Sequence, residues 1–404
     1  MAKLITRLRE AEKLLVLCFA TFMVMAGQGV VGPVLPLYAR DFGVSTAVVG
    51  LTLTVFALAR LILNVPAGLI ADRFGRRILL VGGPILTSVG MFGSGFADSI
   101  SSLLMWRFVA GAGSAFYMSG ALIYLIDIAP INRRARYVAT NQWALSVGVA
   151  LGPGVGGLVA ERWGLAAPFH LVGVIGVASA IYAAFRLPET LRPRTDSEQS
   201  ARSATEVKRI VYSGPFMAIA FVTGTIFMTR AGTRATLVPL HADGVLAWGP
   251  GEIGLVFTIT GVMTLFTLWP ATWATENLGW APVILFSGVA AALGTFVIAS
   301  SGTPLWFVIG NVILTLGTGT AGPAPAAFVA ELFPERLRGL GIGLYRSAGD
   351  VGFVIGPPAL GWLSETASMP TAFRTAGCLV VAAAIWFFVS TGRNNDAVAS
   401  KSLQ

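Results

Sequence analysis

The chain has 404 residues, of which 55% are hydrophobic and only 12% are charged. A soluble domain carries about a quarter charged residues, so this chain lacks the polar surface that a water-soluble protein of its size needs. The net charge of +9 does not indicate nucleic-acid binding, because the positive residues lie in short loops between apolar stretches. The composition favours an integral membrane protein and excludes a nucleic-acid-binding domain.

The two cysteines, Cys18 and Cys378, lie far apart in apolar segments. They predict neither a disulfide framework nor a metal site, and we expect two small buried side chains. The first apolar run begins at Leu14 after a basic start. It is too long for a signal peptide and lacks a clear small-residue cleavage site, so we predict a retained first helix.

About twelve apolar runs are long enough to cross the hydrocarbon core, which takes about 20 residues of helix. In chain order they are 14–39, 47–71, 78–97, 103–129, 137–160, 167–187, 216–240, 253–272, 281–300, 305–332, 340–363 and 372–390. We predict an all-α integral membrane protein in two pseudo-symmetric bundles. A six-helix bundle at 1–187 is followed by a polar cytoplasmic linker at 188–211 and a second six-helix bundle at 212–404.

The distribution of Lys and Arg predicts the orientation of these helices. The loops after the second, fourth, sixth and tenth runs are rich in arginine, whereas the loops on the opposite side carry Arg40, Arg162 and Arg374. Positive loops stay on the cytoplasmic side, so we predict cytoplasmic termini. The expected location is the inner or plasma membrane of the cell, with a multi-pass topology.

The second half of the chain repeats the first at an offset of 204 residues. The segments that start at Pro130 and Pro334 align without gaps, with nine of 32 positions identical, among them Glu161 and Glu365. The same offset aligns the loops after the second and eighth runs. Two six-helix halves related by an axis normal to the membrane are one repeat design of secondary transporters.

The loop after the second run reads GLIADRFGRR, residues 68–77. Gly68 allows neighbouring helices to approach closely, and Gly75 permits a tight turn. Asp127, near the cytoplasmic end of the fourth run, is placed to pair with an arginine of the loop.

This loop resembles the pattern G-x-L-A-D-R-x-G-R-R that the major facilitator superfamily carries between its second and third helices, with Ile70 at the leucine position. The resemblance implies a conformational latch. Its residues would be Gly68, Asp72, Arg73, Gly75, Arg76, Arg77 and Asp127.

The segment WRFVAGAGSA, residues 106–115, resembles the fourth-helix motif of the same superfamily. The resemblance implies a role in proton transfer for Arg107. The alternative is that Arg107 reaches the nearby outer interface with its long side chain.

The segment GVALGPGVGG, residues 148–157, resembles the fifth-helix motif G-x-x-x-G-P-x-x-G-G of the antiporter branch. Small residues at four-residue spacing let helices touch along a seam, and a proline bends the helix. The predicted seam consists of Gly148, Gly152, Pro153, Gly156 and Gly157. Residues 32–45 also resemble the end of the first helix of the twelve-helix drug:proton antiporters, so the resemblance covers essentially the whole chain.

One departure concerns the proton site. Many of these exporters keep an acid within the first helix, where this chain offers Gln28 as the deep polar group. Asp350, in the eleventh run, is the one acid well inside an apolar run. It could carry the proton, or it could form a fixed pair with Arg346 one turn away. The proton-coupling candidates are Arg107, Asp350 and Arg346.

Polar residues deep in the apolar runs are the candidates for a substrate cavity, which we expect near the midplane between the halves. They are Gln28, Arg60, Asn141, Gln142, Arg230, Arg234 and Asn311. Arg230 and Arg234 share a helix face and favour an anionic or zwitterionic substrate, unless they reach an interface or bind carbonyls. His170 and His241 lie at predicted outer helix ends, where we expect surface positions.

No constellation predicts catalysis, a metal site or a cofactor, and there is no Walker-type nucleotide loop. We therefore predict a transporter and not an enzyme. It would export small organic compounds or drugs in exchange for protons by alternating access, as a monomer in the lipid bilayer. A dedicated exporter of one anionic metabolite or lipid, a symport uptake carrier, and a sensor or scaffold without transport are the alternatives.

Overall fold

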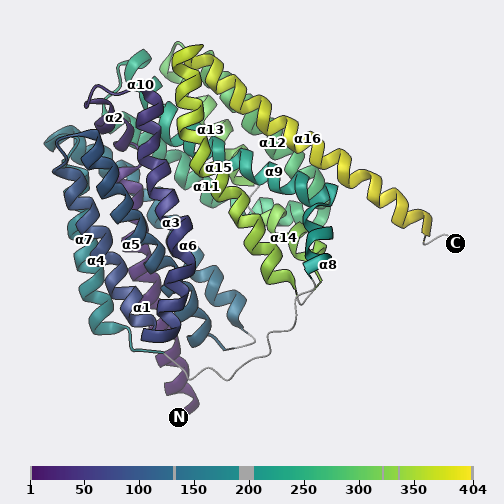
Figure 1. Ribbon diagram of the computed structural model, residues 1–404, viewed down its shortest axis with the longest axis horizontal. Coiled ribbons are helices and arrows are strands. Elements are labelled where there is room, and N and C mark those ends of the chain that lie inside the picture. Colours follow the sequence, from purple (N-terminus) through teal and green to yellow (C-terminus); the bar gives the residue numbers. More distant parts are fainter. Residues whose placement is uncertain (1, 131–132, 191–203, 321–322, 335–336, 402–404) are drawn as a thin grey trace. The chain divides into compact units, whose positions relative to one another are not determined.

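The computed structural model describes residues 2–130, 133–190, 204–320, 323–334 and 337–401, and all of its regular secondary structure within these ranges is helical. A helix satisfies its backbone hydrogen bonds internally, as a segment inside hydrocarbon must. The predicted all-α fold is confirmed (Figure 1). Most of the predicted linker and several loop arginines lie outside the described residues.

The first part of the chain forms α1 Ala2–Val31, α2 Leu35–Arg40, α3 Thr46–Phe74, α4 Arg76–Gly95, α5 Ile100–Ile128, α6 Arg134–Trp163 and α7 Ala167–Arg186. The prediction merged α1 and α2 into one helix. Pro33 lies in the turn between them, where its missing N–H cannot continue the helix.

The second part forms α8 Ala204–Val211, α9 Gly214–Met228, a π-helix Thr229–Leu237, α10 Val238–Leu246, α11 Pro250–Leu278, α12 Trp280–Ala299, α13 Pro304–Thr320, α14 Pro323–Leu332, α15 Arg338–Thr366 and α16 Met369–Lys401. The prediction gave one helix for α9, the π-helix and the start of α10, and one helix for α13 and α14. Among the described residues, eleven helices are long and apolar enough to span a membrane, and α15 is a further helix of 29 residues.

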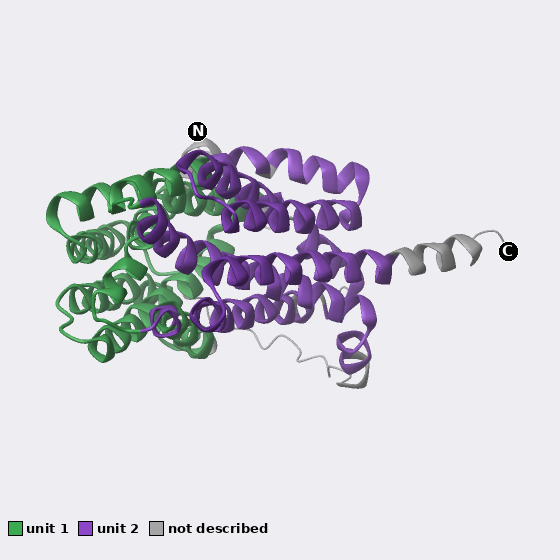
Figure 2. Ribbon diagram, turned by 90° about the horizontal axis from the view of Figure 1, so that it is seen from above, with its two compact units in different colours: residues 1–44, 51–195, 247–262 green, residues 45–50, 196–246, 263–404 purple. Residues whose placement is uncertain are grey.

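The chain folds into two compact units (Figure 2). Unit 1 comprises Met1–Val44, Leu51–Thr195 and Ala247–Val262, and unit 2 comprises Ser45–Gly50, Asp196–Leu246 and Met263–Gln404. The helices α3 and α11 therefore each begin in one unit and continue in the other. The predicted bundles at 1–187 and 212–404 are each continuous in the sequence, unlike the two units, and their boundaries stay a prediction.

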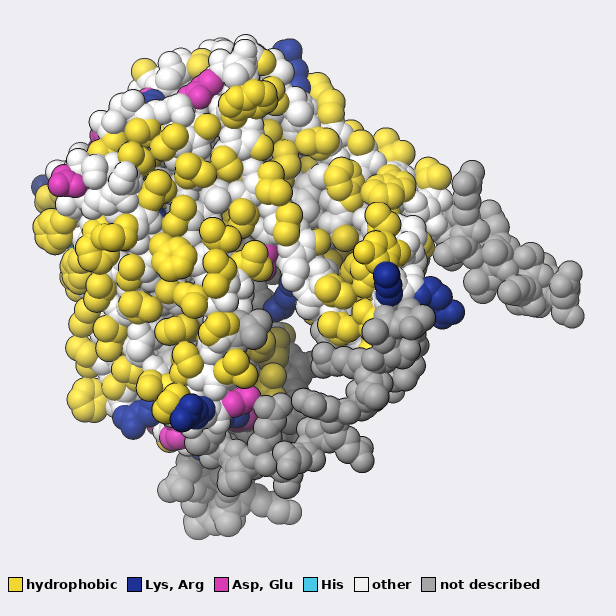
Figure 3. Space-filling model, viewed as in Figure 1, with side chains coloured by type: hydrophobic (Ala, Val, Ile, Leu, Met, Phe, Trp, Pro, Cys, Tyr) yellow, Lys and Arg dark blue, Asp and Glu magenta, His cyan; other side chains and the backbone are white. Residues whose placement is uncertain are grey.

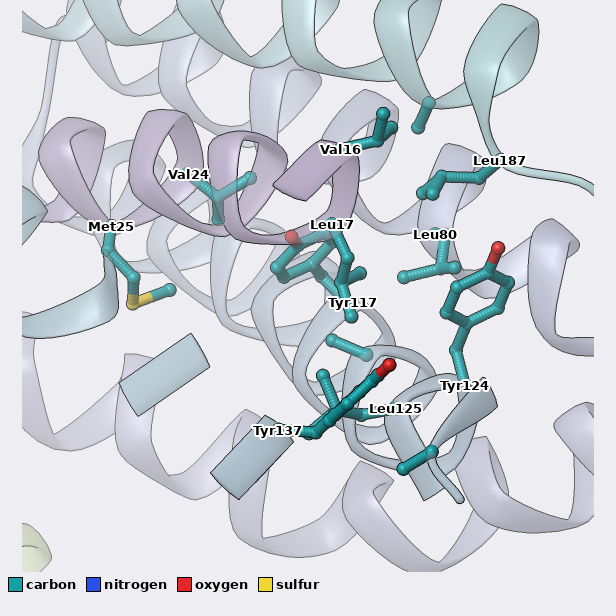
Figure 4. Close-up of a cluster of buried hydrophobic side chains, with 13 residues drawn as sticks. Val16, Leu17, Val24, Met25, Leu80, Tyr117, Tyr124, Leu125, Tyr137 and Leu187 are labelled. Carbon is teal, nitrogen blue, oxygen red and sulfur yellow. The ribbon is translucent and has the colours of Figure 1, made fainter. Parts of the chain in front are cut away.

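In unit 1, α1 packs against α6 and α7, and α4 packs against α5 and α7. A cluster of buried side chains from α1, α4 and α5 lies between these helices (Figure 4). Tyr117 is fully buried in it, and its hydroxyl lies 2.9 Å from Thr21 Oγ1. The cluster thus combines apolar packing with a satisfied polar group, as a buried hydroxyl requires.

In unit 2, α12 packs against α13 and α16, and α9 packs against α15 and α16. Aromatic side chains fill one end of this packing. The rings of Phe328 and Phe387 are 4.9 Å apart and nearly perpendicular, and Trp280 lies 4.6 Å from Phe328. Such edge-to-face pairs stabilise an interior beyond the area that they bury.

Hydrophobic side chains cover much of the face that is in view in Figure 3, as lipid contact requires. Phe185, Trp269 and Phe266 are 84%, 79% and 76% exposed. Cys18 is buried as expected, but Cys378 is exposed, so the expectation of two buried cysteines is wrong for Cys378. In a membrane helix an apolar residue need not face the protein core, which is why hydropathy did not distinguish the two positions.

Candidate functional site

Arg76, the first residue of α4, brings together three charged residues of the predicted latch. Its Nε donates to Asp127 Oδ2 at 2.8 Å, and its second terminal nitrogen lies 3.8 Å from Asp72 Oδ1. The other terminal nitrogen donates to the carbonyl of Ala71 at 3.1 Å. Because the Arg76 side chain is only 11% exposed, solvent screens this network less than it screens a surface pair.

Glu189, which the sequence reading did not single out, caps the start of α4. Its Oε1 accepts from the backbone N–H of Arg76 at 2.9 Å and its Oε2 from that of Arg77 at 3.1 Å. These two donors have no partner inside the helix, and a carboxylate also complements the positive end of the helix dipole. The only signal in the sequence is an acid just after the sixth predicted helix.

Gly75 makes this cap possible. Its φ of +96° lies in the region that glycine adopts without strain, as the predicted tight turn requires. A Cβ at this position would also collide with the Glu189 carboxylate. The adjoining Thr190 hydroxyl donates to Asp127 Oδ2 at 3.0 Å, so both sides of the network converge on Asp127.

The remaining latch residues lie at its margin. Arg73 is exposed and lies 5.2 Å from the Phe74 ring. Arg77 donates to the Ala184 carbonyl at the side of an open groove of about 430 Å³. No described atom lies within 4 Å of a Cβ built at Gly68, so close helix packing is not the reason for this glycine in the structure.

Arg107 lies inside unit 1 and is 4% exposed. Its guanidinium stacks 4.5 Å from the Phe56 ring, Nε donates to the Thr52 carbonyl at 3.3 Å, and one terminal nitrogen lies 3.9 Å from Met91 Sδ. The alternative that Arg107 extends to the outer interface is therefore wrong, because these contacts hold its head in the interior. Embedding a charge in this way is costly and is typical of functional residues.

The glycine motif of α6 has two faces, where the sequence predicted one seam. Gly148, Gly152 and Gly156 face α1, and a Cβ at Gly152 would lie 2.5 Å from the Ala26 carbonyl oxygen. Gly156 lies directly against the Val30 carbonyl. The four-residue spacing thus lets two backbones touch along one stripe.

The other face of the motif packs against the first turns of α11 within unit 1. Gly157 lies against the Pro250 carbonyl, and the Gly154 N–H donates to Thr258 Oγ1 at 2.7 Å. Pro153 directly precedes Gly154 and removes one hydrogen bond from the helix ladder. The sequence did not single out Gly154, because the motif leaves the residue at this position unspecified.

A polar cluster inside unit 1 includes two of the cavity candidates. Gln28 Nε2 donates to Ser114 Oγ at 2.9 Å, and Asn141 Oδ1 accepts from Thr21 Oγ1 at 2.8 Å. Hydroxyl residues were not singled out from the sequence because they occur throughout apolar helices. Gln142 is exposed, and Arg60 is partly buried on α3.

In unit 2, Arg230 and Arg234 lie on the π-helix, and both are partly exposed. Arg230 donates to the Thr318 carbonyl, and its guanidinium lies 5.5 Å from the Phe227 ring. A π-helix is rare and frequently lies at a functional site. Asn311 is 2% exposed and donates to the Phe307 carbonyl of its own helix at 2.9 Å, so it does not line an open surface here.

The other candidates of unit 2 lie in different surroundings. Arg346 is exposed and Asp350 is partly buried, and whether Asp350 carries the proton or pairs with Arg346 stays a prediction. His241 is 4% exposed, between the rings of Phe307 and Phe373. The expectation of a surface histidine is wrong for His241, because two aromatic side chains cover the imidazole.

Apolar spanning helices, a charged loop network and a duplicated glycine motif define a multi-pass membrane transporter. The family model of the Major Facilitator Superfamily matches residues 17–244 and 219–403. The chain therefore belongs to the Major Facilitator Superfamily, and it is a transporter.

Several characterised proteins are similar over most of their length. Multidrug resistance protein 1 of Bacillus subtilis is 26% identical over 85% of this chain and 87% of its own length. The quinolone resistance protein NorA of Staphylococcus aureus is 25% identical over 88% of this chain and 90% of its own. A bacterial homologue of the human lysosomal transporter Spinster, solved in an inward-facing and occupied conformation, has a TM-score of 0.81 at 16% identity and covers 94% of this chain and 96% of its own.

Proposed function

We propose that this transporter is a proton-coupled antiporter that exports small organic compounds or drugs by alternating access. The glycine motif of α6 supports antiport, because it resembles the motif of the antiporter branch, and the charged network around Arg76 supports alternating access, because it resembles the latch of the superfamily. The relatives from B. subtilis and S. aureus are named for resistance to drugs, which supports drugs as substrates and export as the direction of transport.

The observation that carries the coupling is the embedded Arg107. Its contacts are a carbonyl, a thioether and an aromatic ring, so its fixed positive charge can interact with an anionic group of a substrate or with a carboxylate that has lost its proton. Asp350 is the proposed proton carrier in unit 2. Within unit 1 the proposed substrate contacts are Gln28 and Asn141, and within unit 2 the proposed contact is Arg230.

The test is a substrate screen in proteoliposomes that contain a pH-sensitive dye. A substrate gradient should drive proton movement in the opposite direction, and an uncoupler should collapse export from cells. Transport that continues in vesicles without a gradient of any ion contradicts the coupled mechanism. Substrate-dependent proton flow in the same direction as the substrate would identify a symporter instead.

A second candidate function is the export of an anionic metabolite or lipid. It rests on Arg230, whose cation is partly exposed on the π-helix beside Phe227 and Thr318. A partly desolvated guanidinium binds carboxylate or phosphate strongly, often in a bidentate manner.

We predict that Arg230→Gln and Arg234→Gln each reduce the transport of anionic substrates by about tenfold or more, because a lost charge-assisted contact of about 1.5–3 kcal/mol corresponds to that factor. The transport of a cationic dye should change by less than about threefold. Arg186→Gln is the matched control, since Arg186 forms an exposed pair with Glu12 at 2.8 Å. Equal losses for both classes of substrate would contradict an anion-specific site.

A further inference from the structure

The contact between α6 and α11 in unit 1 has a counterpart in unit 2, between α15 and the first turn of α3. A Cβ at Gly254 would lie 2.5 Å from the Pro153 carbonyl oxygen, and one at Gly50 would lie 2.5 Å from the Pro357 carbonyl carbon. Pro153 and Pro357 are 204 positions apart, and so are Gly50 and Gly254. The internal repeat therefore builds one backbone contact twice, once within each unit.

The same correspondence continues one turn further. Gly157 lies against the Pro250 carbonyl, and a Cβ at its counterpart Gly361 would lie 2.6 Å from the Thr46 carbonyl oxygen. Pro250 and Thr46 are the first residues of α11 and α3. The small residues thus bring the last turns of α6 and α15 directly against the starts of two other helices.

A carboxylate stands at the end of each contact. In unit 2, Glu365 Oε1 accepts a hydrogen bond from the backbone N–H of Thr46. The first N–H groups of a helix lack partners within the helix, and Ser45 Oγ accepts from another of them, the N–H of Val48, at 3.3 Å. Glu365 lies 319 positions after Thr46 in the sequence, so this cap joins distant parts of the chain.

In unit 1, Glu161 occupies the matching place with one chemical difference. Its counterpart donor is missing, because Pro250 has no backbone N–H. Its Oε2 lies against Gly251, where a side chain would collide with it. The interaction of Glu161 is therefore that of a charge with the positive end of a helix, while Glu365 adds a hydrogen bond. Glu252 in the first turn of α11 carries the same charge and weakens the effect of Glu161 further.

We propose that Glu365 and Glu161 are locking residues, which hold the first turns of α3 and α11 against α15 and α6 and so favour the closed form of each contact. When a contact opens, the carboxylate and the N–H groups at the helix start separate and are hydrated individually. Removing the carboxylate then raises the population of the open form. Both contacts lie at the predicted outer ends of the helices. The lock is independent of substrate and proton coupling and goes beyond the proposed function.

The test uses two reporter cysteines at matched positions. Val49 and Ile253 are 204 positions apart in the first turns of α3 and α11, and each is 1% exposed. Val49→Cys and Ile253→Cys are introduced separately after Cys18 and Cys378 are replaced by serine, and their alkylation by a soluble maleimide is timed in the purified protein in nanodiscs. The rate reports the open population when opening is fast relative to alkylation.

Glu365→Ala should raise the alkylation rate at Val49→Cys about fivefold, the factor that a typical lost helix cap corresponds to. Glu365→Gln, which keeps an acceptor and loses the charge, should produce a smaller rise. Glu161→Ala should raise the rate at Ile253→Cys by less than Glu365→Ala does at its own reporter. This order follows from the missing N–H of Pro250.

Two controls separate the lock from other effects. Asp98→Ala removes an acid that accepts a hydrogen bond from the neighbouring Ser99 at 3.2 Å, away from both contacts along the chain, and should change neither rate. Leu17→Cys reports on the core of unit 1, where the residue is fully buried, and its rate should stay constant in every folded variant. Alanine variants that alkylate within twofold of the parent, or an equal rise with Asp98→Ala, would overturn the proposal. Because no substrate is involved, this result is independent of whether drug export is observed.

Discussion

At the scale of single residues, the pair of Arg76 and Asp127 is a short charged contact at a mostly buried place. The two side chains are 11% and 18% exposed and are joined by a hydrogen bond of 2.8 Å. By contrast, the pair of Arg186 and Glu12 has the same length but is 49% and 59% exposed. Burial therefore distinguishes a pair that should affect stability from one that should not.

We predict that Asp127→Asn lowers the free energy of unfolding by about 1–3 kcal/mol, because the Arg76 guanidinium loses a charged acceptor at a mostly buried site. Thermal unfolding of the purified protein measures the change, and drug efflux should fall with it. Glu12→Gln should leave both quantities within the experimental scatter. A stable Asp127→Asn protein with normal efflux would contradict the role of this network as a latch.

Glu189 should act through the start of α4. We predict that Glu189→Ala lowers the free energy of unfolding by about 1 kcal/mol, since two backbone N–H groups lose their acceptor. Glu189→Gln should cost less, because it retains a carbonyl oxygen. Hydrogen exchange of the first turn of α4 provides the local measurement, and unchanged exchange in Glu189→Ala would show that water replaces the cap without loss.

At the scale of helices, α6 shows how one motif serves two partners. Its stripe of Gly148, Gly152 and Gly156 lies against α1, while Gly154 and Gly157 meet the first turns of α11. The two sets point in different directions because residues four apart share a face and residues one or two apart do not. The helix α6 thus packs closely against α1 on one face and contacts the start of α11 on another.

Gly156→Ala tests the fixed side. The added methyl group meets the Val30 carbonyl of a neighbouring helix, so we predict a loss of about 1–3 kcal/mol in the free energy of unfolding from overpacking. Gly82→Ala is the matched control, since a Cβ at Gly82 meets no described atom within 4 Å. It should be neutral or stabilise the protein by up to about 1 kcal/mol, because alanine favours the helix over glycine. Similar losses in both variants would show that the contact with α1 tolerates a methyl group.

The π-helix that carries Arg230 and Arg234 is a second element that the sequence did not reveal. The sequence predicts one helix from Phe216 to Leu240, although the segment 229–237 is much less apolar than the residues before it. The backbone N–H of Val238 instead donates to the carbonyl of Thr233, five residues earlier, which is the π-helical register. Hydrogen-bond register depends on packing against neighbouring helices and leaves no signature in the pattern of apolar residues.

At the scale of the whole molecule, the arginine-rich loops carry a prediction about topology. We predict that both termini are cytoplasmic, because positive loops resist transfer across the membrane. Reporter fusions check this directly: a fluorescent protein at either terminus should mature in the cytoplasm, and a periplasmic phosphatase at the same position should be inactive. The opposite pattern at both ends would reverse the predicted orientation in the membrane. The contacts of α6 with α11 and of α15 with α3 would then lie at the cytoplasmic ends of the helices.

The sequence by itself determined the membrane class, the helical fold, the repeat and the family, because each depends on composition and on spacing along the chain. Apolar runs of sufficient length must form helices in lipid, and a duplicated pattern implies duplicated contacts. The loop motif also correctly placed Asp72, Arg76 and Asp127 near one another.

Only the tertiary structure decided which of these residues share a contact and which are buried. It brought Glu189 to the start of α4 and placed His241 between aromatic rings. It also placed Glu365 on the first turn of α3, 319 residues away. Hydropathy records whether a residue tolerates lipid or protein around it, but it does not record which neighbour it meets. That choice depends on the three-dimensional packing of helices that are distant in the sequence.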